Sequence, residues 1–244
     1  MIEVSNIYKS FRQQRVLDGV NLVVEAQQNL IILGRSGTGK SVLLKLIIGL
    51  LKPDRGTIKV FDQEITAINR EALNQVRKRM GFLFQDAALY DSMTVRENVA
   101  FPLHRHTEMS EAEINEVAIN KLAQVGLKDY ADKMPAELSG GMRKRAGLAR
   151  ALALDPTVML YDEPTAGLDP ITAREIDELI LQLKESGVTS ITVTHEIVSA
   201  RNVGDQFAVL HEGAVIEKGS FEQLQESNNQ FVRQFVANAF ADVH

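Results

Sequence analysis

Short apolar segments alternate with longer segments of helical periodicity over most of the chain. Residues 29–33 (Asn-Leu-Ile-Ile-Leu) form a largely apolar run that ends at glycines, which is typical of a strand buried on both faces. Helical periodicity follows at 41–51, and the composition of 173–185 also favours a helix. Further strands are predicted at 81–84, 157–161, 190–194 and 206–210. Because strands that alternate with helices build parallel sheets, we predict a largely parallel α/β core.

The N-terminal part of the chain has a different pattern. Residues 2–4 and 20–24 have strand-like composition, and the polar stretch 12–15 lies between them. A further strand at 56–60 precedes a charged helix predicted at 70–80. Strands that follow one another without intervening helices favour a hairpin-like antiparallel sheet.

Helical patterning also dominates residues 94–153, where Ser110 and Glu113 form a capping box and Gly126 is a helix stop. This segment is predicted to be a helical insertion. Residues 221–244 are predicted to form two short amphipathic helices. Their apolar positions are Phe221, Leu224, Phe231, Phe235 and Phe240. We interpret them as a packing tail, and a contact with a second copy stays an open alternative.

Composition and charge narrow the function classes. The 244 residues include 45% hydrophobic and 24% charged residues and no cysteine, so disulfide and thiolate-metal frameworks are excluded. A formal net charge of −5 provides no global field for nucleic acid, so no nucleic-acid partner is expected. The basic runs 77–79 and 143–145 are interpreted as solvated helix faces. The N-terminus has no signal sequence, and the apolar stretch 43–51 is too short to span a membrane.

One glycine-rich segment matches G-x4-G-K-[ST] and stands between a predicted buried strand and a helix, as a phosphate-binding loop requires. Backbone amides and the positive end of the helix dipole are expected to hold phosphate, and Lys40 to reach the β- and γ-phosphates. Ser41 offers a hydroxyl to Mg²⁺. The expected nucleotide-binding residues are Gly34, Arg35, Ser36, Gly37, Thr38, Gly39, Lys40 and Ser41.

A second strand ends in two acids, Asp162 and Glu163. Carboxylates at the end of a buried strand are costly unless they meet a cation or water. Asp162 is therefore expected to hold Mg²⁺. Glu163 should point elsewhere and polarise the water that attacks the γ-phosphate.

Besides the phosphate-binding loop and the acid pair, the chain contains the segment Leu138-Ser-Gly-Gly-Met142, which resembles the signature motif of ABC ATPases. The resemblance to this family covers about residues 1–225. It implies a P-loop NTPase (RecA-like) core with an N-terminal antiparallel β subdomain and a helical insertion subdomain. The implied division places the β subdomain and core in 1–85 and 154–225, the helical subdomain in 86–153 and a tail in 226–244. Met142 stands where the family usually has Gln.

The resemblance also implies roles for residues elsewhere. Gln85 matches the Q-loop, with a catalytic and metal-binding role, and His195 matches the switch histidine. Phe11 stands where the family stacks an aromatic ring on adenine. In this family the signature faces the nucleotide of the opposite subunit, which implies a homodimer with two sandwiched ATP molecules. The residues implied for that contact are Ser139, Gly140, Gly141 and, in the D-loop, Asp169. His104 and His106 match no motif and are interpreted as surface residues.

Segments outside the shared ATPase motifs resemble the ATPases of MCE-associated, Mla-type lipid transporters. This resemblance implies a transmembrane permease, an MCE-domain lipid-binding protein, a small STAS-domain subunit in some members, and a place on the cytoplasmic face of the inner membrane. The segments that carry it are 76–80, 83–85, 88–95, 97–103 and 134–138.

Two alternatives stay open. One is an ATPase for a small polar solute such as an amino acid, because no residue of this chain would touch the transported substrate. The other is a non-transport ABC clamp on nucleic acid or on a division complex. The chain has neither tandem cassettes nor a basic or coiled-coil insertion, which argues against nucleic acid and leaves the cell-division clamp.

Overall fold

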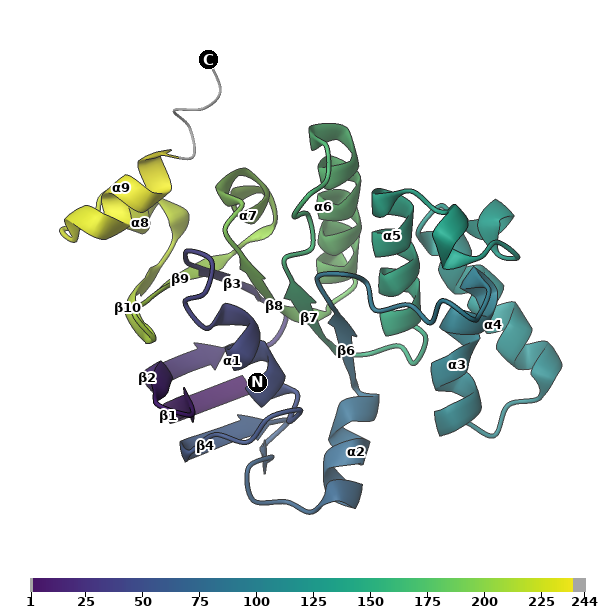
Figure 1. Cartoon of the computed structure of the whole chain (residues 1–244), viewed down its shortest axis with the longest axis horizontal. Coiled ribbons are helices and arrows are strands. Elements are labelled where there is room, and N and C mark those ends of the chain that lie inside the picture. Colours follow the sequence, from purple (N-terminus) through teal and green to yellow (C-terminus); the bar gives the residue numbers. More distant parts are fainter. Residues whose placement is uncertain (1, 239–244) are drawn as a thin grey trace.

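A six-stranded sheet forms the centre of the molecule, seen in a computed structural model that describes residues 2–238, with only the backbone of Asn238 (Figure 1). The strand order is β10-β9-β3-β8-β7-β6. The strands β3, β6, β7, β8 and β9 pair in parallel, and β10 pairs antiparallel with β9. The prediction of a largely parallel core is confirmed. The strand bounds are β3 (Asn29–Leu33), β6 (Met80–Leu83), β7 (Val158–Asp162), β8 (Thr189–Thr194), β9 (Gln206–His211) and β10 (Ala214–Gly219).

A second, antiparallel sheet has the order β2-β1-β4-β5. Its strands are β1 (Ile2–Phe11), β2 (Gln14–Val24), β4 (Arg55–Val60) and β5 (Gln63–Glu64). The predicted hairpin is confirmed, but its strands are longer than predicted and run into the polar stretch, where Phe11 pairs with Gln14. Both faces of the hairpin are exposed or half-buried there, so the sequence lacks the alternation that marks a strand.

Helix α1 (Lys40–Ile47) packs between the two sheets (Figure 1). Strand β3 contributes side chains to the hydrophobic cores on both faces of the six-stranded sheet. Leu30 and Ile32 belong to the core around α1, and Ile31 and Leu33 belong to the core on the opposite face. This alternation is the two-residue period of a strand covered on both faces. It fixes the carboxyl end of β3, and hence the loop before α1, between two packed layers.

The predicted helical insertion is confirmed as three α-helices and two short 3-10 helices. The capping box of Ser110 and Glu113 starts α4 as predicted, and Thr94 and Glu97 form a second one at α3. The bounds are α3 (Val95–His106), α4 (Glu111–Gln124), η1 (Lys128–Tyr130), η2 (Pro135–Glu137) and α5 (Gly140–Ala151). The charged helix before the insertion is α2 (Arg70–Lys78).

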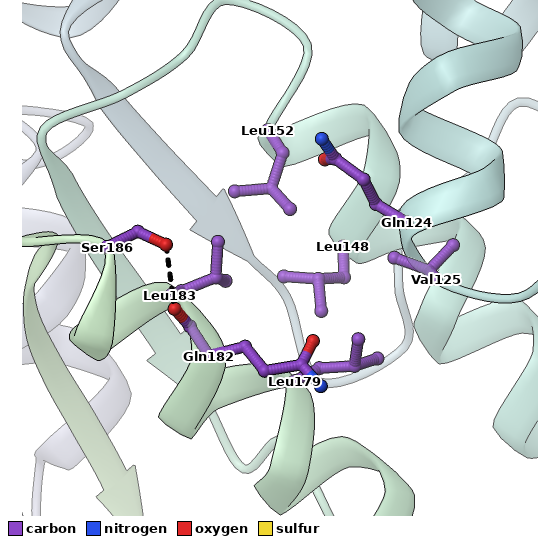
Figure 2. A pocket seen from close by; sticks show the side chains of 8 residues that line it. All are labelled: Gln124, Val125, Leu148, Leu152, Leu179, Gln182, Leu183 and Ser186. Carbon is purple, nitrogen blue, oxygen red and sulfur yellow. Dashed lines mark hydrogen bonds between the residues drawn. The ribbon is translucent and has the colours of Figure 1, made fainter.

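The insertion meets the core along α6 (Pro170–Glu185), and a cleft of about 280 Å³ lies between them (Figure 2). Leucines from both sides line it, namely Leu148 and Leu152 of α5 and Leu179 and Leu183 of α6. The seam between insertion and core is therefore incompletely filled at this end of α5.

The end of the described chain packs on the core. Helices α8 (Phe221–Gln225) and α9 (Gln230–Asn238) contribute Phe221, Leu224, Val232 and Val236 to the buried cluster on one side of the sheet. This agrees with the interpretation as a packing tail, and Phe240 lies outside the described residues. Three elements were not predicted, namely β5, α7 (Ile197–Val203) and β10. No helix among residues 2–238 is both long enough and apolar enough to cross a membrane.

The interpretation of the two basic runs as solvated faces is wrong in part, most clearly for Arg77 and Lys144, and only Arg79 and Arg143 of the two runs are exposed. Arg77 is half-buried and donates to the carbonyls of Ile48 and Gly49, at 2.9 and 2.7 Å, where α1 ends. Lys144 is only 5% exposed. In contrast, His104 and His106 are exposed, and among the described residues no group of three or more His, Asp or Glu side chains could hold a metal.

Candidate functional site

The glycine-rich loop turns directly from β3 into α1. Gly39 is the N-cap of α1 with a φ of 101°, in the left-handed region that favours glycine. A Cβ there would lie 2.9 Å from Leu17 Cδ2 and 3.0 Å from the Val16 carbonyl oxygen, both on β2. The hairpin therefore packs tightly against the loop, and only glycine fits this position. The arrangement leaves the positive end of the α1 dipole facing the loop.

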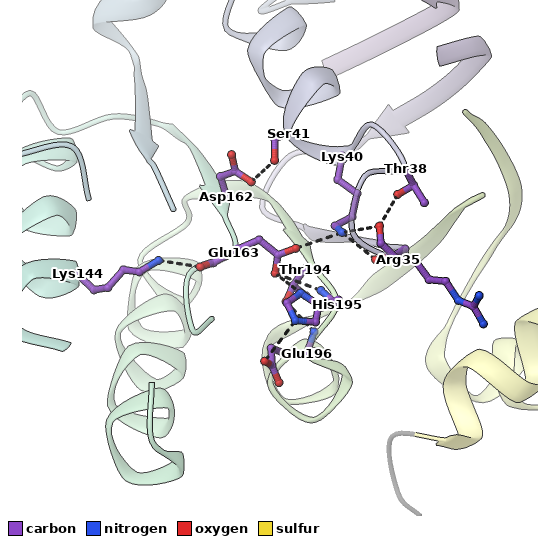
Figure 3. A network of polar contacts seen from close by, with 11 residues as sticks. Arg35, Thr38, Lys40, Ser41, Lys144, Asp162, Glu163, Thr194, His195 and Glu196 are labelled. Carbon is purple, nitrogen blue, oxygen red and sulfur yellow. Dashed lines mark hydrogen bonds and ion pairs between the residues drawn. The ribbon is translucent and has the colours of Figure 1, made fainter. Parts of the chain in front are cut away.

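Lys40 lies inside this loop with 5% of its surface exposed. Its Nζ donates to the Gly34 carbonyl at 2.8 Å and the Arg35 carbonyl at 3.2 Å, and it lies 3.2 Å from Glu163 Oε1 (Figure 3). The Thr38 hydroxyl also donates to the Arg35 carbonyl, at 2.9 Å, which closes the turn. The ammonium thus stands in the cradle where a phosphate group of a nucleotide would need positive charge.

Ser41 and Asp162 form an oxygen pair beside the loop. The Ser41 hydroxyl donates to Asp162 Oδ1 at 2.7 Å, across the first turn of α1 and the end of β7. Burial raises the pKa of Asp162 above its ordinary value, and the hydrogen bond from Ser41 opposes that rise. Two oxygen ligands of this kind, in a place where a carboxylate needs a positive partner, fit Mg²⁺.

Glu163 has a strained backbone and a fully engaged side chain. Its φ is 48°, a left-handed conformation that costs a non-glycine residue on the order of 1–3 kcal/mol. Its backbone N–H donates to the Val193 carbonyl at 2.9 Å. Its Oε2 lies 2.9 Å from His195 Nδ1 and accepts from the His195 backbone N–H at 3.2 Å (Figure 3). Adjacent acids therefore point to different partners, Asp162 to the hydroxyl and Glu163 to the lysine and histidine.

A cleft of about 310 Å³ opens beside these groups. Phe11 lines its mouth with 43% of its surface exposed, and Gln85, which follows β6, lines it as well. The cleft brings together most of the sequence-predicted residues, namely Phe11, Ser36, Gly37, Gly39, Lys40, Ser41, Gln85, Glu163 and His195.

The signature residues lie apart from this cleft and do not appear among its lining residues within the described chain. Ser139 is the N-cap of α5, and its hydroxyl accepts from the Met142 N–H at 3.2 Å. Ser139 and Gly140 are exposed. Gly141 is packed so closely on α6 that a Cβ would lie 2.1 Å from Thr172 Cγ2.

Asp169 is also separate from the cleft and caps α6. Its carboxylate accepts from the N–H groups of Ile171 and Thr172 at 3.1 Å each and from the Thr172 hydroxyl at 2.6 Å. These bonds, first of all the one from the Thr172 hydroxyl, lower the pKa of Asp169. One chain thus assembles a P-loop cleft and, elsewhere, a second group formed by Ser139, Gly140, Gly141 and Asp169, hereafter the signature group. In this group Ser139, Gly140 and Asp169 are exposed and Gly141 is buried.

Sequence reasoning missed Lys144 of α5. Its Nζ donates to the carbonyl oxygen of Glu163 at 2.8 Å (Figure 3). Burial lowers the pKa of Lys144, while Asp86, Asp162 and Glu163 act in the opposite direction. The signal was its helical spacing, because residue 144 lies on the same face as the buried positions 141 and 148.

The parallel sheet, the glycine loop that opens α1 and the acid pair at the end of β7 define a P-loop nucleotide-binding protein. A model of the ABC transporter family matches residues 17–166, and the chain belongs to that family. The resemblance to ABC ATPases is confirmed.

Relatives and a solved structure agree with this assignment. The intermembrane phospholipid transport system ATP-binding protein MlaF of Haemophilus influenzae is 42% identical over 97% of this chain and 90% of its own length. The probable ribonucleotide transport ATP-binding protein mkl of Mycobacterium tuberculosis is 44% identical over 96% of this chain, but the match spans only 66% of mkl. The structure superposes with a TM-score of 0.85 on a dimeric, post-hydrolysis state of the ATP-binding cassette MJ0796 bound to ADP and Pi, at 33% identity, covering 90% of this chain and 98% of the other.

Proposed function

We propose that the chain is the ATP-hydrolysing subunit of a transporter that moves phospholipid between bacterial membranes and that it works as a homodimer. The proposal of ATP hydrolysis rests on the contacts of Glu163 with Lys40 and His195 at the P-loop cleft. The similarity to MlaF, over nearly the full length of both chains, supports the phospholipid part.

Nucleotide binding follows from the loop. The amides of residues 34–41 and the α1 dipole favour the triphosphate, and the exposed ring of Phe11 can stack on adenine. Ser41, Asp162 and Gln85 would hold Mg²⁺ at the cleft. When bound, this ion neutralises charge on the β- and γ-phosphates.

The catalytic pair is Glu163 with His195. In the structure the ammonium of Lys40 lies 3.2 Å from Glu163 Oε1 and neutralises the charge of that carboxylate. An arriving γ-phosphate would therefore compete with Glu163 for the ammonium. Glu163 is then free to accept a proton from water, and His195 holds it in place through the 2.9 Å contact. Loss of the γ-phosphate would let the ion pair form again.

The signature group would complete the site of a second copy, since it lies outside the cleft of its own chain. Apolar surface near Asp169 supports such a contact: Ile171 is 76% exposed, and Val198, which shares a pocket with Leu168 and Pro170, is 51% exposed. The similarity to a cassette seen as a dimer supports the same arrangement. Ser139, Gly140, Gly141 and Asp169 would then face the ATP bound to the partner.

The remaining proposed partners are those that the resemblance to Mla-type ATPases implies: a transmembrane permease, an MCE-domain lipid-binding protein and, in some systems, a small STAS-domain subunit. The similarity to MlaF supports a transporter of this kind. The chain would lie on the cytoplasmic face of the inner membrane and attach through the permease. The similarity to mkl, whose name refers to ribonucleotide transport, favours a small polar solute as the second candidate cargo.

The first experiment purifies Glu163→Gln in ATP. Since the amide cannot act as a base, we expect hydrolysis to fall by at least about 100-fold and an ATP-dependent dimer to accumulate, measured by phosphate release and light scattering. Full turnover in this variant would overturn the catalytic assignment. The tagged variant is then recovered from mildly solubilised membranes for mass spectrometry. A permease with an MCE-domain protein supports lipid transport, whereas a permease with a soluble solute-binding protein would move the cargo to a small polar molecule.

A further inference from the structure

One helix, α5, touches three parts of the machinery. Its N-terminus carries Ser139 and the signature glycines. Four residues beyond Gly140, the ammonium of Lys144 reaches the backbone of Glu163. Near its end, Arg150 donates to the carbonyls of Ala87 and Ala88, which follow Gln85 by two and three residues. A helix of 12 residues therefore connects the signature group with the P-loop cleft inside one chain.

The bond from Lys144 fixes the orientation of Glu163. The residue has a left-handed φ of 48°, and its peptide groups are anchored on both sides: the N–H donates to Val193 of β8, and the carbonyl accepts from Lys144 of α5. The only other donor recorded for that carbonyl within residues 2–238 is the Ala166 N–H at 3.4 Å, which is a weaker contact. Because the side chain leaves from this anchored backbone, its direction toward Lys40 and His195 depends on where α5 holds Lys144.

The packing of α5 against α6 differs between the two ends of α5. At its start there is no free space, since Gly141 lies against Thr172 of α6. At its far end Leu148 and Leu152 border the cleft between α5 and α6 (Figure 2). The cleft leaves room for α5 to tilt about its contact with α6, and such a tilt would shift Lys144 relative to β7.

We propose that Lys144 is a positioning residue that aligns Glu163 when the signature group of the same chain engages nucleotide. This rests on the proposed function, in which that nucleotide is bound to the P-loop of the partner. Each catalytic carboxylate is then aligned by the ATP in the other site. Hydrolysis should therefore be cooperative in ATP, and the cooperativity should depend on Lys144.

The test compares the full chain with Lys144→Met, which keeps length and apolar packing but removes the donor. We expect kcat to fall by about 10- to 100-fold, because a small misplacement of a catalytic group is costly, while ATP binding stays within about twofold. The Hill coefficient should fall from above 1 to about 1. Lys144→Arg keeps a charged donor and should restore part of both kcat and cooperativity.

The matched control is Lys121→Met. Lys121 of α4 is also a buried lysine, 9% exposed, and pairs with Asp155 in the loop between α5 and β7; neither residue lines the P-loop cleft. It should lose stability, measured by thermal unfolding, without losing cooperativity. Equal loss of cooperativity in both variants would reduce the role of Lys144 to structural support and overturn the proposal.

Two further readouts separate the proposal from the function on which it rests. Lys144→Met combined with Glu163→Gln should still form the ATP-dependent dimer, since the signature residues are intact. The proposed function itself would be contradicted if the wild-type chain did not hydrolyse ATP and the Glu163→Gln variant did not form a dimer in ATP. Normal kcat and an unchanged Hill coefficient in Lys144→Met, beside a fully active wild type, would overturn only this inference. If Lys144→Met does not fold, Lys144→Leu, which also removes the donor, takes its place, and unchanged kinetics in that variant would equally refute the proposal.

Discussion

The P-loop cleft and the signature group are built in opposite ways. In the cleft, Lys40, Asp162 and Glu163 are each at most 7% exposed, and all three have charged or hydroxyl partners within 3.2 Å. In the signature group, Ser139 and Gly140 are exposed, and the polar side chains of Ser139 and Asp169 only cap their own helices. One chain therefore preorganises the groups for hydrolysis in a buried cleft and leaves exposed the surface that a second chain would contact.

We expect the greatest loss of ATP binding and hydrolysis from a substitution in the P-loop cleft. Lys40→Ala removes the ammonium from the loop and should weaken ATP binding and lower hydrolysis by at least about 100-fold, since preorganised charge at a phosphate is worth several kcal/mol. Titration with a fluorescent ATP analogue measures the affinity. Lys52→Ala, an exposed lysine beyond α1, is the control and should bind normally. Unchanged affinity in Lys40→Ala would remove the cleft from nucleotide binding.

A substitution in the signature group should lower hydrolysis less. Ser139→Ala should lower hydrolysis about 10-fold while the affinity of the isolated chain for ATP stays unchanged, because the proposed role of the serine is to contact the nucleotide bound to a second chain. Ser110→Ala is matched to it, since Ser110 also caps a helix by accepting from the N–H three residues later. Both variants should lose about 0.5–2 kcal/mol of stability. If Ser110→Ala loses as much activity, the effect at Ser139 is only capping.

The base of the nucleotide gives a third, weaker test. Phe11→Ala should raise KM for ATP by about 2- to 10-fold, the equivalent of ~0.5–1.5 kcal/mol of stacking, and leave kcat almost unchanged. Phe11→Tyr keeps the ring and should behave like the wild type. Steady-state kinetics with ATP measure both. A fall in kcat at constant KM would mean that Phe11 supports the fold of the hairpin rather than binding the base.

The smallest effect concerns Asp177 of α6, which is 4% exposed and accepts hydrogen bonds from Ser199 and Asn202 behind the Asp169 loop. Burial raises its pKa, so the folded chain binds this proton more tightly than the unfolded chain. Proton binding by Asp177 therefore stabilises the folded chain fully below the pKa that this carboxyl has in the unfolded chain. This stabilisation is lost as the pH rises through the pKa of Asp177 in the folded chain. Asp177→Asn should gain about 2–4 °C in Tm relative to wild type at pH 8, and this gain should shrink as the pH is lowered toward the ordinary pKa of aspartate, by calorimetry. Exposed Asp129→Asn should show no such pH dependence.

The sequence predicted the parallel core and the P-loop because both are local patterns. An apolar run followed by glycines and Lys40 specifies a strand, a phosphate loop and a helix without knowledge of the rest of the fold. The strand β10 was missed because it lies at the sheet edge and is mostly half-buried, which removes the alternation of apolar and polar residues. Helix α7, with seven residues, is too short to display a period.

Lys144 shows where local reasoning failed in the site. A run of three basic residues is usually solvated, and nothing near it in sequence indicates that Glu163, 19 positions away, would supply a buried acceptor. That contact depends on the packing of α5 against the end of β7. The roles of Gln85, Ser139 and Asp169 likewise came from resemblance, since their chemistry depends on groups that the chain brings close only when folded or paired.

The exposed ring of Phe11 has a practical consequence. The chain contains no tryptophan, so Phe11→Trp would place a single indole at the mouth of the cleft. Its emission, excited where tyrosine does not absorb, would report nucleotide arrival and departure in real time from one known position. The same residue that is proposed to hold the base could thus serve as an optical sensor for each stage of the cycle.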